Sequence, residues 1–316
     1  MKIILTLKPS LIVFLSAFVM FSCRHDSALT KYNTENVIVV VMDGARYSEV
    51  LGDADALYTP RLKNNLTPTS VISHHFYNNG STFTIPGHAA LTTGNFQDID
   101  NNGGQLPQNS SIFQHWIKAN NNNTEKAWII ASKDKLEILK NCVDSEWNGQ
   151  YMPSTNCGAN GLGTGYREDS VTMVRALSIL TNNQPKLALI NFREPDYSGH
   201  AADWPKYIKG IQDVDEYIYR LWDFIENDPN YKGKTTLFVT NDHGRHLDSV
   251  NDGYISHGDD CLGCRHISFY AFGPDFKQDY SMGEEHEMID IPATIAELLH
   301  FDLPDGKGRI MQELFK

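Results

Sequence analysis

The chain has 316 residues, of which 41% are hydrophobic, and a formal net charge of −12 at pH 7. This length is enough for one large domain or two small ones. The acidic balance argues against binding of long nucleic acids through their phosphates, but it leaves room for a small, local anion site.

The N-terminus has the features of a secretory signal. Two lysines precede an apolar run that ends at Phe21 and is short for a membrane span, so we expect a signal peptide over residues 1–22. Ser22 followed by Cys23 resembles a bacterial lipoprotein signal, with an ordinary cleaved signal as the alternative. We therefore expect a lipid anchor at Cys23, a polar tether over 23–35 and a place in the bacterial cell envelope, facing the periplasm or the cell surface. Cleavage of residues 1–22 would remove two lysines and no acidic residue, so the formal charge of the mature chain would be −14 instead of −12.

Four cysteines follow this leader: Cys142, Cys157, Cys261 and Cys264. An even number of cysteines in an exported chain predicts two disulfides, and the most local of the three possible pairings joins 142 to 157 and 261 to 264. The alternative for the "CLGC" segment (261–264) is half of a zinc site. That alternative needs two further soft ligands, and the sequence contains no second pair of this spacing.

Strand-like and helix-like segments alternate along the chain. Five apolar runs predict strands, at residues 37–42, 127–132, 187–192, 236–240 and 267–272. Their nearly continuous apolarity is typical of strands that are buried on both faces of a parallel sheet. Apolar residues at helical spacing predict helices over 169–182, 205–226 and 288–300. The pattern predicts an α/β fold, a three-layer α/β/α sandwich with a mostly parallel central sheet, as one domain over residues 36–316.

Acidic and histidine side chains follow three of these strands. Asp43 follows the first strand, Asp196 and His200 follow the third, and Asp242 and His243 follow the fourth. A single Asp in such a place is usually a cap or part of a turn. The carboxyl ends of parallel strands meet at one edge of the sheet, where ligands bind, so we expect the five side chains to lie together. Asp and His are ligands suited to zinc or manganese.

The segment "STFTIPGHAALTTG" (81–94) supplies a candidate nucleophile. Pro86 predicts the start of a short helix and Gly94 its end. Thr84 then lies just before the helix N-terminus, where free amides and the helix dipole favour a bound anion. A threonine hydroxyl is a poor nucleophile without a base or a metal, and a metal site is available. We expect His88 to be a packing or hydrogen-bonding residue.

The motifs "VVVMDG", "TIPGHAALTTG", "EPDYSGH", "TNDHG" and "IPATIAELL" occur in this order from about residue 36 to the C-terminus. Together they resemble the alkaline phosphatase superfamily, specifically its nucleotide pyrophosphatase/phosphodiesterase-like branch with a sulfatase-like fold. A sulfatase itself is disfavoured, because the Cys/Ser-x-Pro-x-Arg motif of those enzymes is replaced here by residues 84–88, "TIPGH".

This resemblance implies two metal ions, Zn²⁺ or alternatively Mn²⁺, and a phosphothreonine intermediate on Thr84. One ion would be held by Asp43, Asp242 and His243. The other would be held by Asp196, His200 and one later histidine, for which we prefer His257 and keep His266 as the alternative. Two ions of this kind stabilise the attacking and the leaving oxygen of an in-line displacement.

The substrate is expected to be a small phosphate ester. By the resemblance, an asparagine contacts a phosphate oxygen, and Asn102 or Asn95 could do so. Monoesterases of the superfamily hold a dianion with Arg or Lys, yet between residues 82 and 124 the only basic residue is Lys118. We therefore expect a preference for phosphodiester or pyrophosphate-type bonds, unless Arg46 or Arg193 reaches the site.

Two alternatives remain open. One is a phosphomonoesterase or another ester hydrolase of the same superfamily. The other is a non-catalytic surface lipoprotein that binds glycan or phosphate. The sequence leaves the oligomeric state open.

Overall fold

The computed structural model describes residues 32–316. The predicted signal peptide, Cys23 and most of the predicted tether lie outside these residues. Within the described part of the chain, no helix is both long and apolar enough to cross a membrane.

An eight-stranded sheet forms the centre of the fold, in the order β5-β4-β6-β1-β7-β8-β2-β9. Every strand is parallel to the others except β8, which runs antiparallel to both of its neighbours. The strands are β1 (Asn36–Met42), β2 (Val71–Ser73), β4 (Ala127–Ala131), β5 (Ser154–Cys157), β6 (Leu187–Phe192), β7 (Thr235–Thr240), β8 (Phe269–Phe272) and β9 (Tyr280–Met282). A two-stranded sheet is formed by β3 (Phe76–Tyr77) and β10 (His286–Glu287). The predicted α/β class with a mostly parallel sheet is confirmed.

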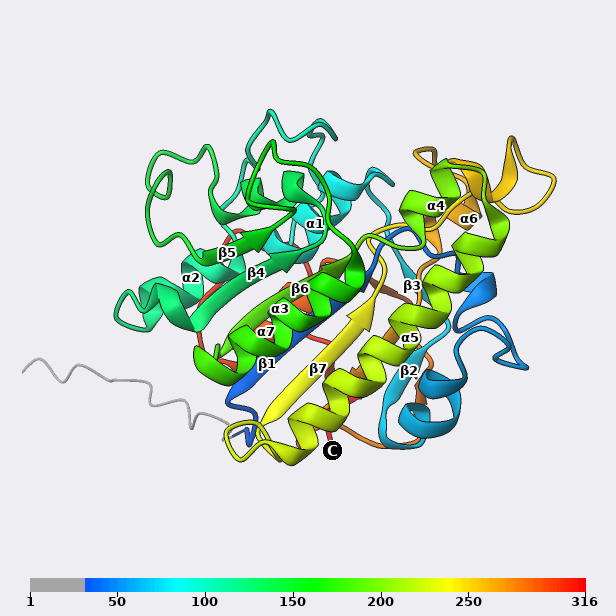
Figure 1. Cartoon of the computed structure of the whole chain (residues 1–316). Helices are drawn as coiled ribbons and strands as arrows, with labels where there is room; N and C mark the ends of the chain where they lie inside the picture. The colour runs from blue at the N-terminus through cyan, green and yellow to red at the C-terminus, as the bar shows by residue number, and fades with distance from the viewer. Residues whose placement is uncertain (1–31) are drawn as a thin grey trace, which may run out of the picture. The chain divides into compact units, whose positions relative to one another are not determined.

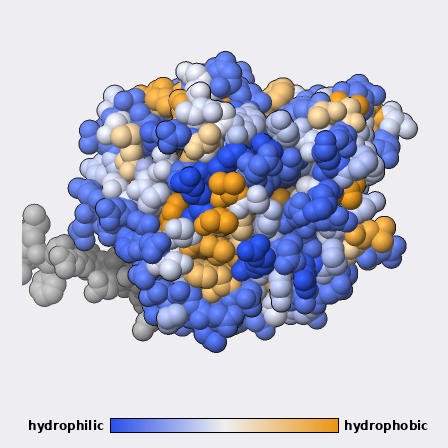
Figure 2. Space-filling view, in the orientation of Figure 1, coloured by the Kyte–Doolittle hydropathy of each residue, from blue (hydrophilic) through white to orange (hydrophobic). Residues whose placement is uncertain are grey.

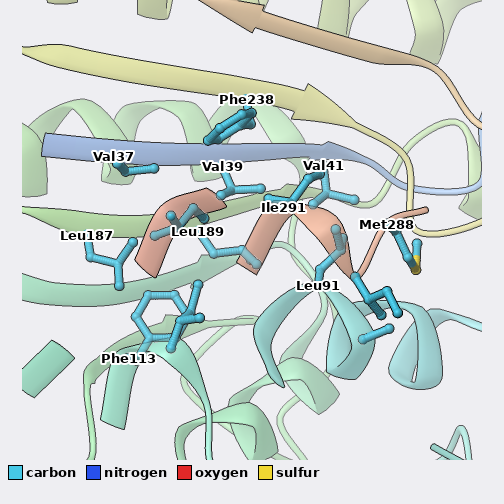
Figure 3. Packing of buried hydrophobic residues seen from close by; sticks show 14 of the residues in the cluster. Val37, Val39, Val41, Leu91, Phe113, Leu187, Leu189, Phe238, Met288 and Ile291 are labelled. Atoms are coloured by element: carbon cyan, nitrogen blue, oxygen red, sulfur yellow. The ribbon is translucent and has the colours of Figure 1, made fainter. Parts of the chain in front are cut away.

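Helices cover both faces of this sheet, and alternate residues of β1 divide into two hydrophobic cores. Val37, Val39 and Val41 pack in the core beneath α1, α2 and α7, as Figure 3 shows. Ile38 and Val40 pack in the opposite core, beneath α3 and α5 (Figure 1). The helices are α1 (Thr84–Thr93), α2 (Ile112–Ala119), α3 (Asp169–Asn182), α4 (Asp196–His200), α5 (Trp204–Asn227), α6 (Leu262–Arg265) and α7 (Asp290–Leu298).

The long helix α5 illustrates why the predicted helices form. Its buried residues Ile211, Val214, Ile218 and Leu221 are spaced by three and four, so they make one apolar stripe that faces the sheet. The side chain of Asp203 caps the helix by accepting the backbone N–H of Lys206. The face that α3 and α5 present to solvent is mostly hydrophilic, with a small apolar area near its centre (Figure 2).

Helix α1 begins two residues earlier than predicted. Thr84 is its first residue, Phe83 is the N-cap, and Pro86 is the third helical residue. Proline is tolerated there because the first helical N–H groups have no partner within the helix. Gly94 ends the helix with a φ of 70°, a left-handed conformation that suits glycine. All ten residues of α1 are buried, so the helix is a fixed part of the interior.

The predicted disulfides are wrong for this structure. Within residues 32–316, Cys142, Cys157, Cys261 and Cys264 are all free thiols. Cys157 ends β5 and directs its Sγ toward the carbonyl of Ile129, 3.7 Å away. Its orientation is therefore set by the sheet and not by Cys142.

The register of the parallel strands places the predicted ligands at one level. Val41 of β1 lies opposite Asn191 of β6 and Thr240 of β7. Asp43 and Asp242 therefore follow β1 and β7 at the same height, at the end of the sheet where α1 and α4 lie (Figure 1).

Candidate active site

Asp43, Asp242 and His243 form a fully buried group at the ends of β1 and β7. Asp242 Oδ1 accepts the backbone N–H groups of Gly44 (3.1 Å) and of His243 (3.0 Å), and this fixes the carboxylate. The His243 Nδ1–H donates to the carbonyl of Gly244 at 2.8 Å, so the lone pair of Nε2 points into the site. Nε2 lies 3.5 Å from Asp242 Oδ2 and 3.8 Å from Asp43 Oδ1. Burial lowers the pKa of His243 to about 3, so its imidazole is neutral at working pH.

Asp196, His200 and His257 form the adjoining group. His257 donates from Nδ1 to the carbonyl of Thr82 (2.8 Å), and its Nε2 lies 3.4 Å from Asp196 Oδ1. His200 Nε2 lies 3.4 Å from the same carboxylate oxygen and 3.1 Å from His257 Nε2. The rings of His257 and His243 stack at 3.8 Å, which joins the two groups. The side chain of His200 is 51% exposed, so this group reaches the protein surface.

The alternative ligand His266 lies elsewhere. Its Nε2 donates to the carbonyl of His74 at 2.8 Å. Its ring stacks between Tyr47 and Tyr77, with centroid distances of 3.7 and 4.8 Å. The structure therefore brings His257, and not His266, to Asp196.

The orphaned atoms of this cluster fit divalent metal ions. Asp242 Oδ2 and His243 Nε2 are buried acceptors that have no hydrogen-bond partner in the described part of the chain. Buried polar atoms without partners are rare, because each costs free energy. The donor set is carboxylate oxygen and imidazole nitrogen, which suits Zn²⁺ or Mn²⁺. Asp43, Asp242 and His243 lie close enough together to hold one metal ion, and so do Asp196, His257 and His243, whereas His200 lies at the exposed edge of this second set.

Thr84 lies beside this cluster with a lysine that sequence reasoning missed. Lys133 is buried, and its Nζ is 3.1 Å from Thr84 Oγ1, 2.7 Å from Asp43 Oδ1 and 2.6 Å from Asp196 Oδ2. Burial alone would lower the pKa of Lys133, but Asp196 and Asp43 outweigh it and raise the pKa, so the ammonium is charged. Lys133 follows β4 by two residues. Its place just after a buried strand is the same sequence signal that Asp43, Asp196 and Asp242 carry.

Arg245 is the second buried cation of the site. Its guanidinium bonds Asp196 Oδ1 and the carbonyl groups of Tyr254 and Ile255. Burial alone would raise the pKa of Asp196, but Lys133 and Arg245 hold it well below its usual range. Asp196 is therefore a carboxylate, and Arg245 ties it to the loop that carries His257.

A chain of hydrogen bonds connects the start of α1, where Thr84 lies, to the ends of the central strands. His88 Nδ1–H donates to the carbonyl of Thr84 at 2.8 Å, and Asn191 donates to His88 Nε2 at 3.2 Å. Asn191 also donates to Asp43 Oδ2 at 2.9 Å. The expected hydrogen-bonding role of His88 is confirmed, and Thr84 and Asp43 are positioned by one network.

The family of the chain follows from a match that spans most of the described domain. Residues 37–268 match the model of the type I phosphodiesterase / nucleotide pyrophosphatase family. The chain belongs to this family. The predicted membership of the alkaline phosphatase superfamily is thereby confirmed.

Curated relatives share only part of their length with this chain. A 2,3-bisphosphoglycerate-independent phosphoglycerate mutase from Gracilaria tenuistipitata var. liui is 27% identical over 138 residues, which are 43% of this chain and 25% of the mutase. GPI ethanolamine phosphate transferase 2 from Candida albicans is 23% identical over 262 residues, which are 76% of this chain and 27% of the transferase. The chain thus spans about a quarter of each relative.

Solved structures share the fold over nearly the whole chain. Murine ectonucleotide pyrophosphatase/phosphodiesterase 5 has a TM-score of 0.62 at 17% identity and covers 89% of this chain and 100% of its own. Alkaline phosphatase PafA has a TM-score of 0.66 at 12% identity and covers 90% of this chain and 100% of its own. At these identities the likeness concerns the fold.

An asparagine lies at the N-terminus of α1 beside Thr84, and it is neither Asn102 nor Asn95. Asn101 Oδ1 accepts the backbone N–H of Ile85 at 2.9 Å and also bonds Lys135 Nζ at 3.0 Å. Asn102 instead closes an exposed turn with its side chain. Asn95 lies beyond the C-terminus of α1, roughly 15 Å along the helix from Thr84. Of these three asparagines, Asn101 is the one that bonds the first turn of α1, and the substrate contact of Asn102 or Asn95 stays a prediction.

Arg46 and Arg193, the two arginines that could have supplied a positive charge to the site, are paired with acidic side chains elsewhere. Arg46 bonds Glu49 at 2.6 Å and Asp248 at 2.8 Å, and Arg193 pairs with Glu168 and lies over the ring of Tyr197. The basic residue next to Thr84 is instead Lys133, which lies outside residues 82–124. The premise of uncharged surroundings, on which the expected diester preference depended, is therefore wrong.

Proposed function

We propose that the chain is a metal-dependent phosphohydrolase with Thr84 as its nucleophile. The observation that supports this best is the buried Thr84 hydroxyl at the start of α1, which shares the ammonium of Lys133 with one aspartate of each Asp and His group. A helix N-terminus offers free N–H groups to phosphate oxygens, so the nucleophile lies where an anion is favoured.

Each group of side chains would hold one divalent ion. Asp43, Asp242 and His243 would hold the first; Asp196, His200 and His257 would hold the second. Ions bound there would lower the pKa of a nearby hydroxyl or water and neutralise phosphate oxygens. The hydrogen bonds of His243 and His257 to backbone carbonyls already fix the tautomer that ligation needs.

The proposed reaction is a double displacement at phosphorus, with Thr84 as the first nucleophile and water as the second. Thr84 Oγ1 attacks phosphorus, the bond to the ester oxygen breaks, and the alcohol leaves with a proton. Water then hydrolyses the phosphothreonine, which restores the threonine hydroxyl and releases phosphate. His88 holds the carbonyl of Thr84, and Asn101 holds the next N–H, so the nucleophile keeps its orientation through both steps.

The charges around Thr84 favour a phosphate monoester as the substrate. Lys133 is 3.1 Å from Thr84 Oγ1, and Lys135 reaches the same end of α1 through Asn101. Two divalent ions together with these ammonium groups would exceed the charge of the three carboxylates, so a dianion suits the site better than a monoanion. The expected diester preference depended on the absence of a basic residue beside Thr84, and Lys133 is such a residue.

Replacement of the nucleophile tests this proposal. Thr84→Ala should reduce kcat for p-nitrophenyl phosphate on the order of a thousandfold or more while bound metal is retained. Thr84→Ser should keep measurable turnover and form phosphoserine, which acid quenching and mass spectrometry would detect. Metal-loaded, folded Thr84→Ala protein that retains more than a few per cent of the activity would contradict the assignment.

A diester or pyrophosphate substrate is the second candidate, favoured by the family match over residues 37–268. The ratio of kcat/KM for p-nitrophenyl phosphate to that for bis-p-nitrophenyl phosphate, under one set of metal conditions, separates the two. We expect the monoester to be preferred. A clear preference for the diester would reverse the substrate assignment but leave Thr84 as nucleophile, and absence of turnover with both would favour a binding protein.

A further inference from the structure

A second group of metal-binding side chains lies outside the candidate active site. The group comprises His246, Asp259, Cys261 and Cys264, and one ligand atom from each lies within 4.8 Å of all the others. The members come from the segment that follows β7, and none of them belongs to the Asp and His groups beside Thr84.

Backbone geometry fixes the two thiols. Cys261 is the N-cap of α6 and Cys264 is its third residue, so one tight turn carries both, with Cys264 N–H bonded to the Cys261 carbonyl at 3.1 Å. Gly263 lies against the backbone of Arg245, where a Cβ would come within 2.5 Å of the carbonyl oxygen. The turn therefore packs closely against the backbone of Arg245, the residue that precedes His246.

His246 is oriented as a metal ligand is. Its Nδ1 lies 2.9 Å from Asp252 Oδ1, so this nitrogen carries the proton that the carboxylate accepts. The other nitrogen, Nε2, faces Asp259 Oδ2 at 3.0 Å, and the side-chain N–H of Asn251 donates to both atoms, at 3.3 and 3.1 Å. A metal ion between the imidazole and the carboxylate would take the place of this amide. A carboxylate on the distal nitrogen is the usual partner of a metal-bound histidine.

We propose that His246, Asp259, Cys261 and Cys264 bind one zinc ion in a structural site. Four ligands close a tetrahedron, which is the pattern of structural zinc, and paired thiolates select zinc over hard cations. A disulfide between the two cysteines would use only two of the four converging groups. It would give no role to the convergence of His246 Nε2 and Asp259 on the same two sulfur atoms.

The site would hold the loop that delivers His257. This loop runs between His246 and Cys261, and the Asp259 carbonyl accepts the hydroxyl of Thr82 at 2.8 Å. His257 binds the carbonyl of the same Thr82. A zinc ion that clamps both ends of the loop would therefore fix His257 relative to Thr84, two residues beyond Thr82.

Cobalt substitution tests the proposal independently of the proposed activity. The Asp and His groups contain no sulfur, so a near-ultraviolet thiolate-to-cobalt charge-transfer band can arise only from cysteine ligands. Reduced, metal-free protein given Co²⁺ should show this band with the intense visible bands of a tetrahedral site, and so should Asp43→Asn. The band should disappear in the double variant Cys261→Ser/Cys264→Ser and persist in the matched control Cys142→Ser.

A milder variant guards against misfolding of the double variant. Asp252→Asn replaces the carboxylate partner of His246 by a neutral acceptor and removes no ligand, and it should weaken zinc affinity 10- to 100-fold, measured by competition with a chelator. A folded, reduced wild type without the thiolate band would overturn the proposal. So would recovery of a Cys261–Cys264 disulfide peptide from protein purified without reductant, or unchanged zinc affinity in Asp252→Asn.

Discussion

The two groups of predicted metal ligands differ in how the fold holds them. Asp43, Asp242 and His243 follow adjacent strands and are fully buried, and backbone groups hold the side chains of Asp242 and His243 in place. We refer to them as the strand group. Asp196, His200 and His257, the loop group, come from the short helix α4 and from a loop, and His200 is half exposed.

This difference predicts unequal sensitivity to substitution. A ligand in a buried, fixed position has no substitute, since neither water nor another side chain can enter without rearrangement of the core. A ligand at the surface can be replaced in part by water, which completes the coordination of many metal ions. The strand group should therefore be the less tolerant of the two.

The largest effect is expected from the strand group itself. Asp242→Asn keeps the oxygen that accepts two backbone N–H groups but loses the charge, so the fold should survive and kcat/KM should fall by more than about 100-fold. His200→Ala should cost no more than about tenfold, because solvent reaches its place. Metal content and turnover of p-nitrophenyl phosphate measure both variants. A larger loss in His200→Ala would reverse the ranking.

The second prediction compares His257, a proposed metal ligand, with His266, a packing residue. His257→Ala should lower kcat/KM about 10- to 100-fold with little change in stability. His266→Ala should leave kcat unchanged but lower the free energy of unfolding by about 1–3 kcal/mol, because it loses stacking on Tyr47 and Tyr77. Denaturant titration and steady-state kinetics on both variants decide the assignment. The opposite pattern would move the ligand to His266.

Lys133 contacts a carboxylate from each group, and its charge should matter for substrate choice. In metal-loaded protein, Lys133→Met should lower kcat/KM for p-nitrophenyl phosphate about 10- to 100-fold, because a charge-assisted hydrogen bond is lost. The loss for bis-p-nitrophenyl phosphate should be smaller. Lys140→Met is the control, since Lys140 pairs with Glu137 on the outside. Equal losses of kcat/KM for the two substrates would show that Lys133 does not contribute to substrate selectivity.

The smallest expected effect concerns pH. Burial, together with the nearby Lys133, lowers the pKa of Lys135 to about 8. Its ammonium is therefore present below that pH and is lost above it, so KM for the monoester should rise roughly threefold between pH 8 and 9. Lys135→Arg stays charged and should flatten this rise. A profile that is the same in both proteins would exclude Lys135 as the titrating group.

The strand group could be predicted because its residues directly follow apolar runs whose neighbours in the sheet carry the same pattern. The loop group was harder, since the distance along the chain from Asp196 to His257 says nothing of where the loop closes. Lys133 carried a readable signal, its place just after β4, whereas Asn101 gains its role only from a turn that brings it to Ile85. The antiparallel direction of β8 could not be predicted, because a short buried apolar strand has the same composition in either orientation.

The parallel ladder that aligns β6, β1 and β7 has a consequence for how such a protein can diversify. Backbone hydrogen bonds set the height of Asp43 and Asp242, and these bonds do not depend on the side chains of the surrounding loops. Lys133 and Asn101, by contrast, come from segments outside that trio. New substrate preferences can therefore arise by exchange of the segments around residues 101 and 133 while the reactive centre is inherited intact, which is the separation of tasks that makes a scaffold evolvable.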